Sequence, residues 1–181
     1  MRALRSAPTG ATRDFDPEEI IVSKTDPKGI ITYTNDVFLR VSGYTREELI
    51  GAPHNIIRHP DMPRGVYRLL WQELTAGREV FALVENLCRD GASYWVLAHV
   101  TPSRDAGGRV VGYHSNRRRP DPEWITAIRP VYARMRAVEQ GHPRPAEAAR
   151  ASLESLEGEL AQSGTTYDAF IWGVIRAAVA A

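Results

Sequence analysis

The spacing of hydrophobic residues changes several times along the chain, and each change marks a predicted element. Two β-branched runs, residues 20–22 and 30–34, stand on either side of Asp26-Pro-Lys-Gly29, whose residue types suit a tight turn. This pattern predicts a β-hairpin. The spacing then becomes helical, and Thr45-Arg-Glu-Glu48 has the spacing of a capping box. We therefore expect two short helices before Gly51.

One longer helix and three strands are predicted next. Apolar residues recur at helical spacing over residues 64–76, between a proline and a glycine that suit the two ends of a helix. Three extended stretches follow, separated by two turns: residues 80–88, 94–101 and 110–116. With the first hairpin they make five antiparallel strands. The fold class is therefore α+β, with short helices packed on one side of the sheet.

Helical patterns fill the C-terminal third. Asp121-Pro-Glu123 starts a helix with a cap, a proline and an acidic first turn, and Pro130 predicts that this helix kinks or restarts. Residues 146–160 form a second helix, and Thr165 or Thr166 is expected to cap a third. The apolar faces of these helices either cover the sheet domain or bring two copies together as a homodimer, and the pattern fits both.

The segment Gly51–Pro63, the proline-rich loop, interrupts this periodicity. Three prolines fix φ and withhold backbone donors, so the loop is expected to be stiff. Arg58, His59 and Asp61 in such a loop are candidate ligand-binding residues. Equally, Arg58 and Asp61 could pair with each other and simply complete a well-capped connection.

Composition narrows the class of protein. The chain has 181 residues, 43% hydrophobic residues and a formal net charge of +1, which is typical of a soluble globular protein and gives no field that favours nucleic acid. Cys88 is the only cysteine, so a disulfide within the chain and a cysteine-rich zinc site are excluded. The sequence has neither a signal peptide nor an apolar run long enough for a membrane span, so we expect a cytoplasmic protein.

Catalytic motifs are missing from the sequence. It lacks a glycine-rich phosphate loop, a nucleophile elbow and a metal-binding histidine pair at helical spacing, so no enzyme is predicted. The basic run Arg117–Arg119 has no interleaved aromatic residues, and nucleic-acid binding is not expected.

Both the order of elements and four local strings resemble the PAS sensor domain of Aer-type aerotaxis receptors. The strings are residues 33–38, 42–51, 53–63 and 86–96. Of these, Pro-His-Asn-x-x-Arg-His-Pro-Asp-Met-Pro at residues 53–63 is the most specific. The resemblance covers roughly residues 18–119, and it implies a PAS fold with a flexible N-terminal arm (1–17), a sensor domain (18–119) and a helical extension (120–181).

That family binds FAD non-covalently and reports redox state or oxygen-linked electron flow. By resemblance, Arg58, His59 and Asp61 stand at positions needed for FAD binding, and Asn35 and Asn86 line the same pocket. A guanidinium offers a bidentate fork for phosphate, and amides offer donors and acceptors for a flavin edge. An alternative role for Asn35, helix capping, needs no ligand.

Two further positions affect this expectation. Trp95 could stack on a flavin or adenine ring, although a tryptophan in a strand is more often part of the core. Family members usually carry a tryptophan where this chain has Val80, a departure that affects affinity, redox potential or occupancy of the pocket.

Two other functions fit the same fold. Haem binding would need an axial ligand, for which His54, His59, His99 and His114 are candidates. A ligand-free interaction module would need no pocket. Light-driven adduct chemistry is not expected, because Cys88 falls on a strand near a turn. In the FAD reading, redox state would reach the helix that starts at Asp121 and then a downstream signalling partner.

Overall fold

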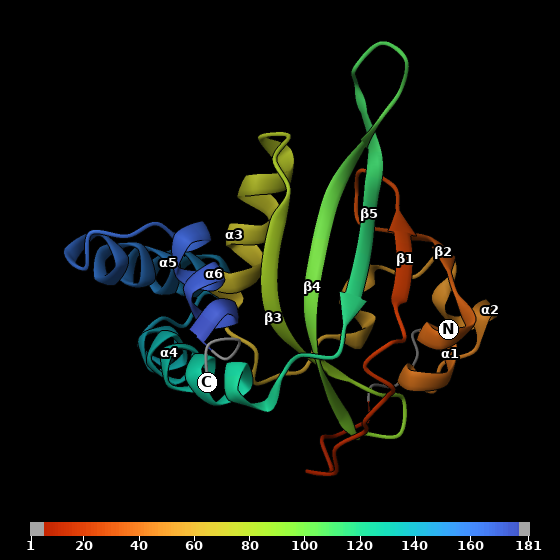
Figure 1. Cartoon of the computed structure of the whole chain (residues 1–181), viewed down its shortest axis with the longest axis horizontal. Coiled ribbons are helices and arrows are strands. Elements are labelled where there is room, and N and C mark those ends of the chain that lie inside the picture. Colours follow the sequence, from red (N-terminus) through yellow and green to blue (C-terminus); the bar gives the residue numbers. More distant parts are fainter. Residues whose placement is uncertain (1–5, 178–181) are drawn as a thin grey trace.

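The structure, a computed structural model, describes residues 6–177. Their elements in chain order are β1 (Ile21–Thr25), β2 (Ile31–Thr34), α1 (Asp36–Ser42), α2 (Arg46–Leu49), the 3-10 helix η1 (His54–Ile57), α3 (Arg64–Thr75), β3 (Val80–Leu87), β4 (Ser93–Arg104), β5 (Val110–Arg118), α4 (Pro122–Gln140), α5 (Pro145–Gln162) and α6 (Tyr167–Ala177). The five strands make one antiparallel sheet in the order β2-β1-β5-β4-β3 (Figure 1). The predicted α+β PAS fold is confirmed.

Local sequence signals account for the ends of most elements. Asp26 Oδ1 accepts the backbone N–H groups of Lys28 and Ile30 at 2.8 and 2.9 Å, which closes the β1–β2 turn. The capping box of α2 forms as predicted, with Thr45 bonded to the Glu48 N–H and the Glu48 carboxylate bonded back to Thr45. Thr166 caps α6 by accepting the N–H of Ala169 at 3.3 Å.

The helices α4, α5 and α6, together the helical extension, pack against α3 and β3 rather than projecting away (Figure 1). Their buried apolar residues belong to the same hydrophobic core as those of the sheet: Ile128, Tyr132, Met135, Leu156, Leu160, Ile171 and Ile175. Residue 119 therefore marks the end of the sheet but not the end of the core. Pro130 neither ends α4 nor restarts it, because α4 runs through this residue as one helix.

The free edge of β3 is covered along its length by side chains and backbone from other segments. The hydroxyl of Tyr167 donates to the Phe81 carbonyl at 3.1 Å, and that of Tyr132 donates to the Leu83 carbonyl at 2.7 Å. Further along, Arg58 of the proline-rich loop forms an isolated antiparallel bridge with Asn86. An open strand edge can pair with other chains, so this cover protects the sheet.

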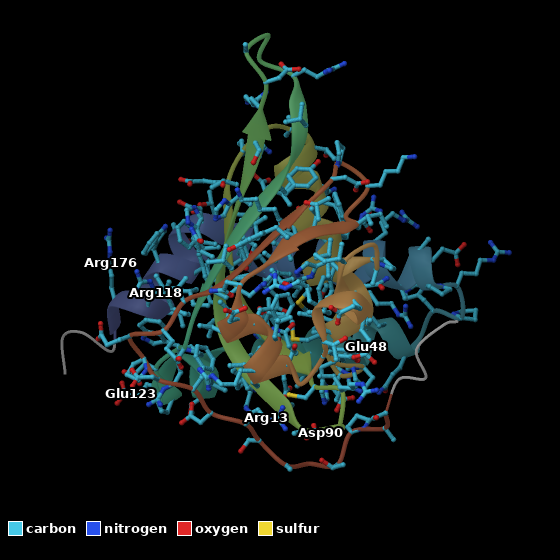
Figure 2. All side chains as sticks on the ribbon, turned by 90° about the vertical axis from the view of Figure 1, so that its right-hand side faces the viewer. Arg13, Glu48, Asp90, Arg118, Glu123 and Arg176 are labelled. Carbon is cyan, nitrogen blue, oxygen red and sulfur yellow. The ribbon has the colours of Figure 1, made fainter. Side chains whose placement is uncertain are left out.

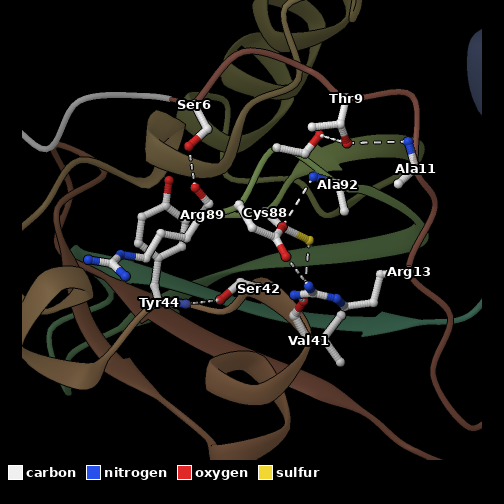
Figure 3. A network of polar contacts seen from close by, with 12 residues as sticks. Ser6, Thr9, Ala11, Arg13, Val41, Ser42, Tyr44, Cys88, Arg89 and Ala92 are labelled. Carbon is white, nitrogen blue, oxygen red and sulfur yellow. Dashed lines mark hydrogen bonds and ion pairs between the residues drawn. The ribbon is translucent and has the colours of Figure 1, made fainter.

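The N-terminal arm predicted at residues 1–17 contacts the sheet domain in the part that the structure describes. Residues 9–13 pair with the β3–β4 turn: Thr9 N–H donates to the Gly91 carbonyl at 2.9 Å, and Ser93 N–H donates to the Ala11 carbonyl at 2.8 Å. Figure 3 shows Thr9, Ala11 and Arg13 of the arm beside Cys88 and Ala92. Arg13 adds an ion pair with Asp90 and a bond of 3.0 Å to the Val41 carbonyl. The arm thereby satisfies backbone N–H and C=O groups of this turn that would otherwise lack partners.

Charged side chains lie mostly at the surface. Arg13, Asp90, Glu123 and Arg176 lie at the edge of the molecule in Figure 2. Within residues 6–177, no helix is both long and apolar enough to cross a membrane.

Candidate functional site

A cavity of about 440 Å³ lies between one face of the sheet, helix α3 and the proline-rich loop. This volume is in the range of small-molecule sites, about 300–1,000 Å³. Its lining residues are Ser23, Thr25, Lys28, Gly29, Pro53, His54, Asn55, Ile57, Arg58, Tyr67, Leu70, Trp71, Leu74, Val84, Asn86, Ala98, Val100, Tyr113, Ser115 and Arg117.

Strand register decides which side chains reach the cavity. Directly paired residues project from the same face of a sheet, and Ser115 pairs with both Ser23 and Val100. Arg117 pairs with Ala98, two positions further along both strands. Alternate residues of three strands therefore point into one space.

Arg117 is a buried cation on the cavity wall, with only 5% of its surface exposed. Its Nη2 donates to Ser23 Oγ at 3.1 Å and to His54 Nε2 at 2.6 Å, and its Nη1 has no hydrogen-bond partner in the part of the chain that the structure describes. No carboxylate within residues 6–177 forms an ion pair with it. Burial lowers the pKa of Arg117 to about 10, so the guanidinium stays charged at neutral pH. This charge lacks a counterion within the described fold.

His54 complements Arg117 as a neutral acceptor. Burial of the ring and, secondarily, the charge of Arg117 hold the pKa of His54 well below its ordinary value. At neutral pH the imidazole is therefore uncharged, and its Nε2 accepts the bond from Arg117 while Nδ1 is left to carry the proton. The pair orients the guanidinium without neutralising it.

Two neutral polar groups join Arg117 in having unused hydrogen-bonding capacity. Asn86 Nδ2 and Ser115 Oγ are buried and have no hydrogen-bond partner among the described residues. Both residues line the cavity, and the rest of the nearby wall is largely apolar: Ile57, Leu70, Leu74, Val84, Ala98 and Val100. Buried polar groups without partners are costly, so their convergence on one apolar cavity points to a ligand that supplies the missing bonds.

Of the six predicted site residues, Arg58 and Asn86 line the cavity. Arg58 lies over the ring of Tyr67, 3.9 Å from its centroid, and its Nη2 donates to the Met62 carbonyl at 3.4 Å. Its bridge to Asn86 places the proline-rich loop and β3 side by side at the cavity wall.

His59 and Asp61 belong to the same loop but do not line the cavity. His59 is buried, and its Nδ1 accepts the Asp61 N–H at 3.1 Å, which shapes the loop. The Asp61 carboxylate points outward and pairs with Arg136 of α4 at 2.7 Å. The alternative expectation, a pair between Arg58 and Asp61, is therefore not observed. These residues set the position of the loop rather than a cavity wall.

Asn35 and Trp95, the other two predicted site residues, are not among the residues that line the cavity. Asn35 is the cap of α1: its Oδ1 accepts from Val22 and Phe38, and its Nδ2 donates to the Ile20 carbonyl. Both polar atoms of its side chain are therefore bonded locally. Trp95 is paired with Glu85 on the opposite face of the sheet. There it stacks on Tyr132 of α4, with the ring centroids 6.4 Å apart.

Val80, the departure from the family pattern, packs with Leu74 and Tyr113 without lining the cavity itself. Leu74 and Tyr113 do line it. A tryptophan at residue 80 would have to share the space that these two side chains occupy.

Sequence reasoning missed Ser23, Ser115 and Arg117 as cavity residues, and it considered His54 only as a candidate haem ligand. Arg117 was considered only as part of a basic run. A signal existed, because Tyr113, Ser115 and Arg117 alternate along one strand and so share a face. What the sequence could not supply is the pairing with β1, which brings Ser23 to them.

The positions of the histidines and of Cys88 bear on haem binding and on light-driven adduct chemistry. His54 is the one histidine of the described residues that lines the cavity, and its Nε2 is already bonded to Arg117. His99 lies on the other sheet face against Glu79, and His114 bonds Asn116. Cys88 is buried outside the cavity with its thiol directed at the Val41 carbonyl, 3.3 Å away. Among the described residues, therefore, no histidine other than His54 and no thiol lines the cavity.

Comparison with known proteins places this geometry in a family. The model of the PAS fold matches residues 20–115. The chain is 41% identical over 117 residues to the aerotaxis receptor of Escherichia coli (strain K12), which covers 65% of this chain and 23% of that protein. It is 30% identical over 94 residues to the nitrogen fixation regulatory protein of Klebsiella pneumoniae, which covers 52% of this chain and 19% of the relative. The chain thus spans less than a quarter of the length of these relatives.

Solved structures agree on the fold. The light-state structure of the blue-light photoreceptor Aureochrome1 LOV matches with a TM-score of 0.54 and 24% identity, over 59% of this chain and 86% of that one. The match to the PAS model covers more than half of the chain and coincides with the sheet and its helices. The chain belongs to the PAS family.

Proposed function

We propose that the cavity binds FAD non-covalently and that the chain is a cytoplasmic redox or oxygen sensor of the aerotaxis type. The observation that carries this proposal is the buried, unneutralised Arg117 beside the unpartnered polar atoms of Ser115 and Asn86. The similarity to the aerotaxis receptor, 41% identity over 117 residues, supports the same class of ligand.

The cavity residues suit the flavin ring system. One edge of an isoalloxazine is polar, with both donors and acceptors, and the opposite edge is apolar. Arg117, Ser115 and Asn86 would meet the polar edge, and the aliphatic residues of α3, β3 and β4 would hold the apolar one. A bound flavin would supply reversible electron uptake. The positive charge of Arg117 favours added negative charge in the cavity, and so favours the reduced state of its occupant.

Asn86 and the proline-rich loop offer a route from the cavity to the helical extension. The Asn86 amide can exchange donor for acceptor by rotation, at little steric cost. Its backbone bridges Arg58, and three residues later Asp61 pairs with Arg136 of α4. A change in the hydrogen bonds of Asn86 would therefore reach α4 through one short loop. From α4 the signal would pass to a second copy of the chain or to a downstream protein.

Absorbance and mass spectrometry of freshly purified protein test the ligand. We expect oxidised flavin bands and FAD in the material released on denaturation. Arg117→Met should lower the midpoint potential of the bound flavin, and Arg117→Lys should retain part of the effect. Asn86→Ala should keep the fold and weaken FAD binding. Colourless protein that also refuses added FAD would overturn the proposal and leave an interaction module as the remaining function.

Hydrogen exchange tests the route to α4. Protection of α4 should differ between oxidised and reduced protein, and Arg136→Met should reduce this difference. Arg134→Met is the matched control, because Arg134 lies on the same helix and pairs with Glu159 of α5 instead of the loop. Equal effects of the two substitutions, or identical α4 protection in both redox states, would contradict the route.

A further inference from the structure

His54 is the one residue on the cavity wall whose type ordinarily changes charge between about pH 5 and 8. No aspartate or glutamate of the described residues lines the cavity. The other ionisable side chains on the wall are Lys28, Arg58, Tyr67, Tyr113 and Arg117. The wall therefore combines three basic side chains with a single imidazole and has no acid to balance them.

The imidazole of His54 is held from three sides. Arg117 and Ser23 reach its Nε2 at 2.6 and 3.1 Å, and the ring of Phe38 is stacked on it with the centroids 6.1 Å apart. The backbone N–H of His54 donates to the Gly29 carbonyl at 2.9 Å, which ties the start of η1 to the β1–β2 turn. Since α1 presents an apolar ring and β1 a hydroxyl, Arg117 is the charged group in contact with the imidazole.

Two causes keep His54 neutral, and negative charge in the cavity would act against one of them. Burial and, secondarily, the charge of Arg117 disfavour the imidazolium, which holds the pKa of His54 well below its ordinary value. An anionic group in the cavity would attract the imidazolium and offset the field of Arg117. Proton binding at His54 is thereby linked to the charge of whatever occupies the cavity.

We propose that His54 takes up a proton from solvent when the occupant of the cavity gains negative charge. The inference rests on the proposed flavin function and goes beyond it, because it assigns the accompanying proton to a residue of this chain. An external reductant supplies two electrons, the flavin binds one proton and keeps one added negative charge, and a second proton from water forms an N–H bond at His54 Nε2.

Protonation would change the hydrogen bonds of His54. Its Nε2 would become a donor, so it would lose the bond that it now accepts from Arg117 and would donate to Ser23 Oγ, 3.1 Å away. The guanidinium would then be free to turn toward the occupant. Because His54 is the first residue of η1, this exchange lies in the same proline-rich loop whose Asp61 contacts α4.

NMR titration of histidine-labelled, full-length protein tests the site directly. The ring signal of His54, assigned with His54→Gln, should titrate at a higher pH in dithionite-reduced, FAD-loaded protein than in the oxidised form. We expect the midpoint to rise by at least about one pH unit, which is about a tenfold gain in proton affinity. His114→Gln is the matched control and should leave this rise unchanged, because His114 projects from the opposite face of β5 to the cavity residues Tyr113 and Ser115.

The midpoint potential of the bound flavin, measured against pH, gives a second readout. A proton taken up on reduction makes the potential fall more steeply as pH rises. Over the pH range in which His54 titrates, the wild type and His114→Gln should take up one more proton per two electrons than His54→Gln does. Equal slopes for His54→Gln and the wild type would overturn the proposal.

Ligand-free variants test the link without a flavin. Ser115→Asp adds a carboxylate to the same face of β5 as Arg117, and Arg117→Met removes the cation, so each should raise the titration midpoint of His54 by at least about one pH unit. Arg117→Lys keeps the positive charge and should change the midpoint less than Arg117→Met does.

The outcomes separate the two proposals. If FAD binds and the midpoint of His54 is the same in oxidised and reduced protein, the proton site is overturned and the flavin function stands. If no flavin binds, the flavin function is overturned, and the proton site is decided by the ligand-free variants. Unchanged midpoints in both Ser115→Asp and Arg117→Met would overturn it as well.

Discussion

Glu139 of α4 caps the N-terminus of α3, the helix that forms one wall of the cavity. Its Oε1 accepts the backbone N–H of Gly65 at 3.0 Å, and Ser152 of α5 donates to the same oxygen at 2.7 Å. A carboxylate is favourable here because the first N–H groups of a helix are unpaired and carry partial positive charge. One side chain thereby joins three helices.

Gly65→Ala should destabilise the protein. An added Cβ would stand 2.9 Å from the backbone nitrogen of Leu153 and would also meet the Ser152 hydroxyl, so α5 would have to move. We expect the free energy of unfolding to fall by about 1–3 kcal/mol in urea denaturation. Gly158→Ala is the control: this α5 glycine has open space around it, and alanine should stabilise the helix by up to about 1 kcal/mol. Equal changes in the free energy of unfolding for the two substitutions would show that the contact between α3 and α5 does not contribute to stability.

Tyr132→Phe should weaken the cover over the β3 edge. The substitution removes the 2.7 Å bond to the Leu83 carbonyl and keeps the ring. Loss of one buried hydrogen bond is expected to cost about 1 kcal/mol of unfolding free energy, and amide exchange along β3 should become faster. Tyr33→Phe, at an exposed ring, should be close to neutral. An unchanged exchange rate in β3 would refute the protective role of the hydroxyl.

His54 should make stability depend on pH below neutrality. Its pKa is held well below the ordinary value in the folded protein, so the unfolded chain takes up a proton first as pH falls below about 6.5. The free energy of unfolding then falls on acidification, by up to about 1.4 kcal/mol per pH unit, whereas above about pH 7.5 the full contribution of His54 is retained. His54→Gln should flatten this dependence between pH 7.5 and 5.5. Parallel profiles of the two proteins in urea titrations would argue against a buried neutral imidazole.

The thiol of Cys88 should be inert in the folded protein. Burial raises its pKa from 9.0 to about 11, so the thiolate fraction near pH 8 is roughly a hundredfold lower than for an unperturbed thiol. Reaction with a chromogenic disulfide should be slow in buffer and fast in denaturant. Rapid labelling of native protein would place the thiol at the surface.

Features fixed within a few residues could be predicted from the sequence. The hairpin at Asp26, the capping box at Thr45 and the cap at Thr166 each depend on side chains bonding to nearby backbone, and all three were predicted. The five strands followed from alternation and turn residues. Their resemblance to a PAS domain supplied the topology that periodicity alone leaves open.

Features that depend on distant pairing could not be read this way. Alternation along β4 separates two faces but does not say which of them meets a cavity, and Trp95 lies on the face that packs against α4. Asp61 was grouped with Arg58, whereas its partner is Arg136, on a helix outside the family resemblance. The position of Arg117 beside Ser23 follows from the pairing of β5 with β1, which the sequence does not show. In each case the deciding neighbour lies many residues away.

Helix α3 serves two neighbours at once, since Leu70, Trp71 and Leu74 border the cavity while its first turn abuts α5. Any occupant that pushes or tilts this helix by a fraction of an ångström must transmit the displacement to the far side, because closely packed interiors yield little. The sheet would then keep its conformation, and α3 alone would carry a displacement from the cavity to α5.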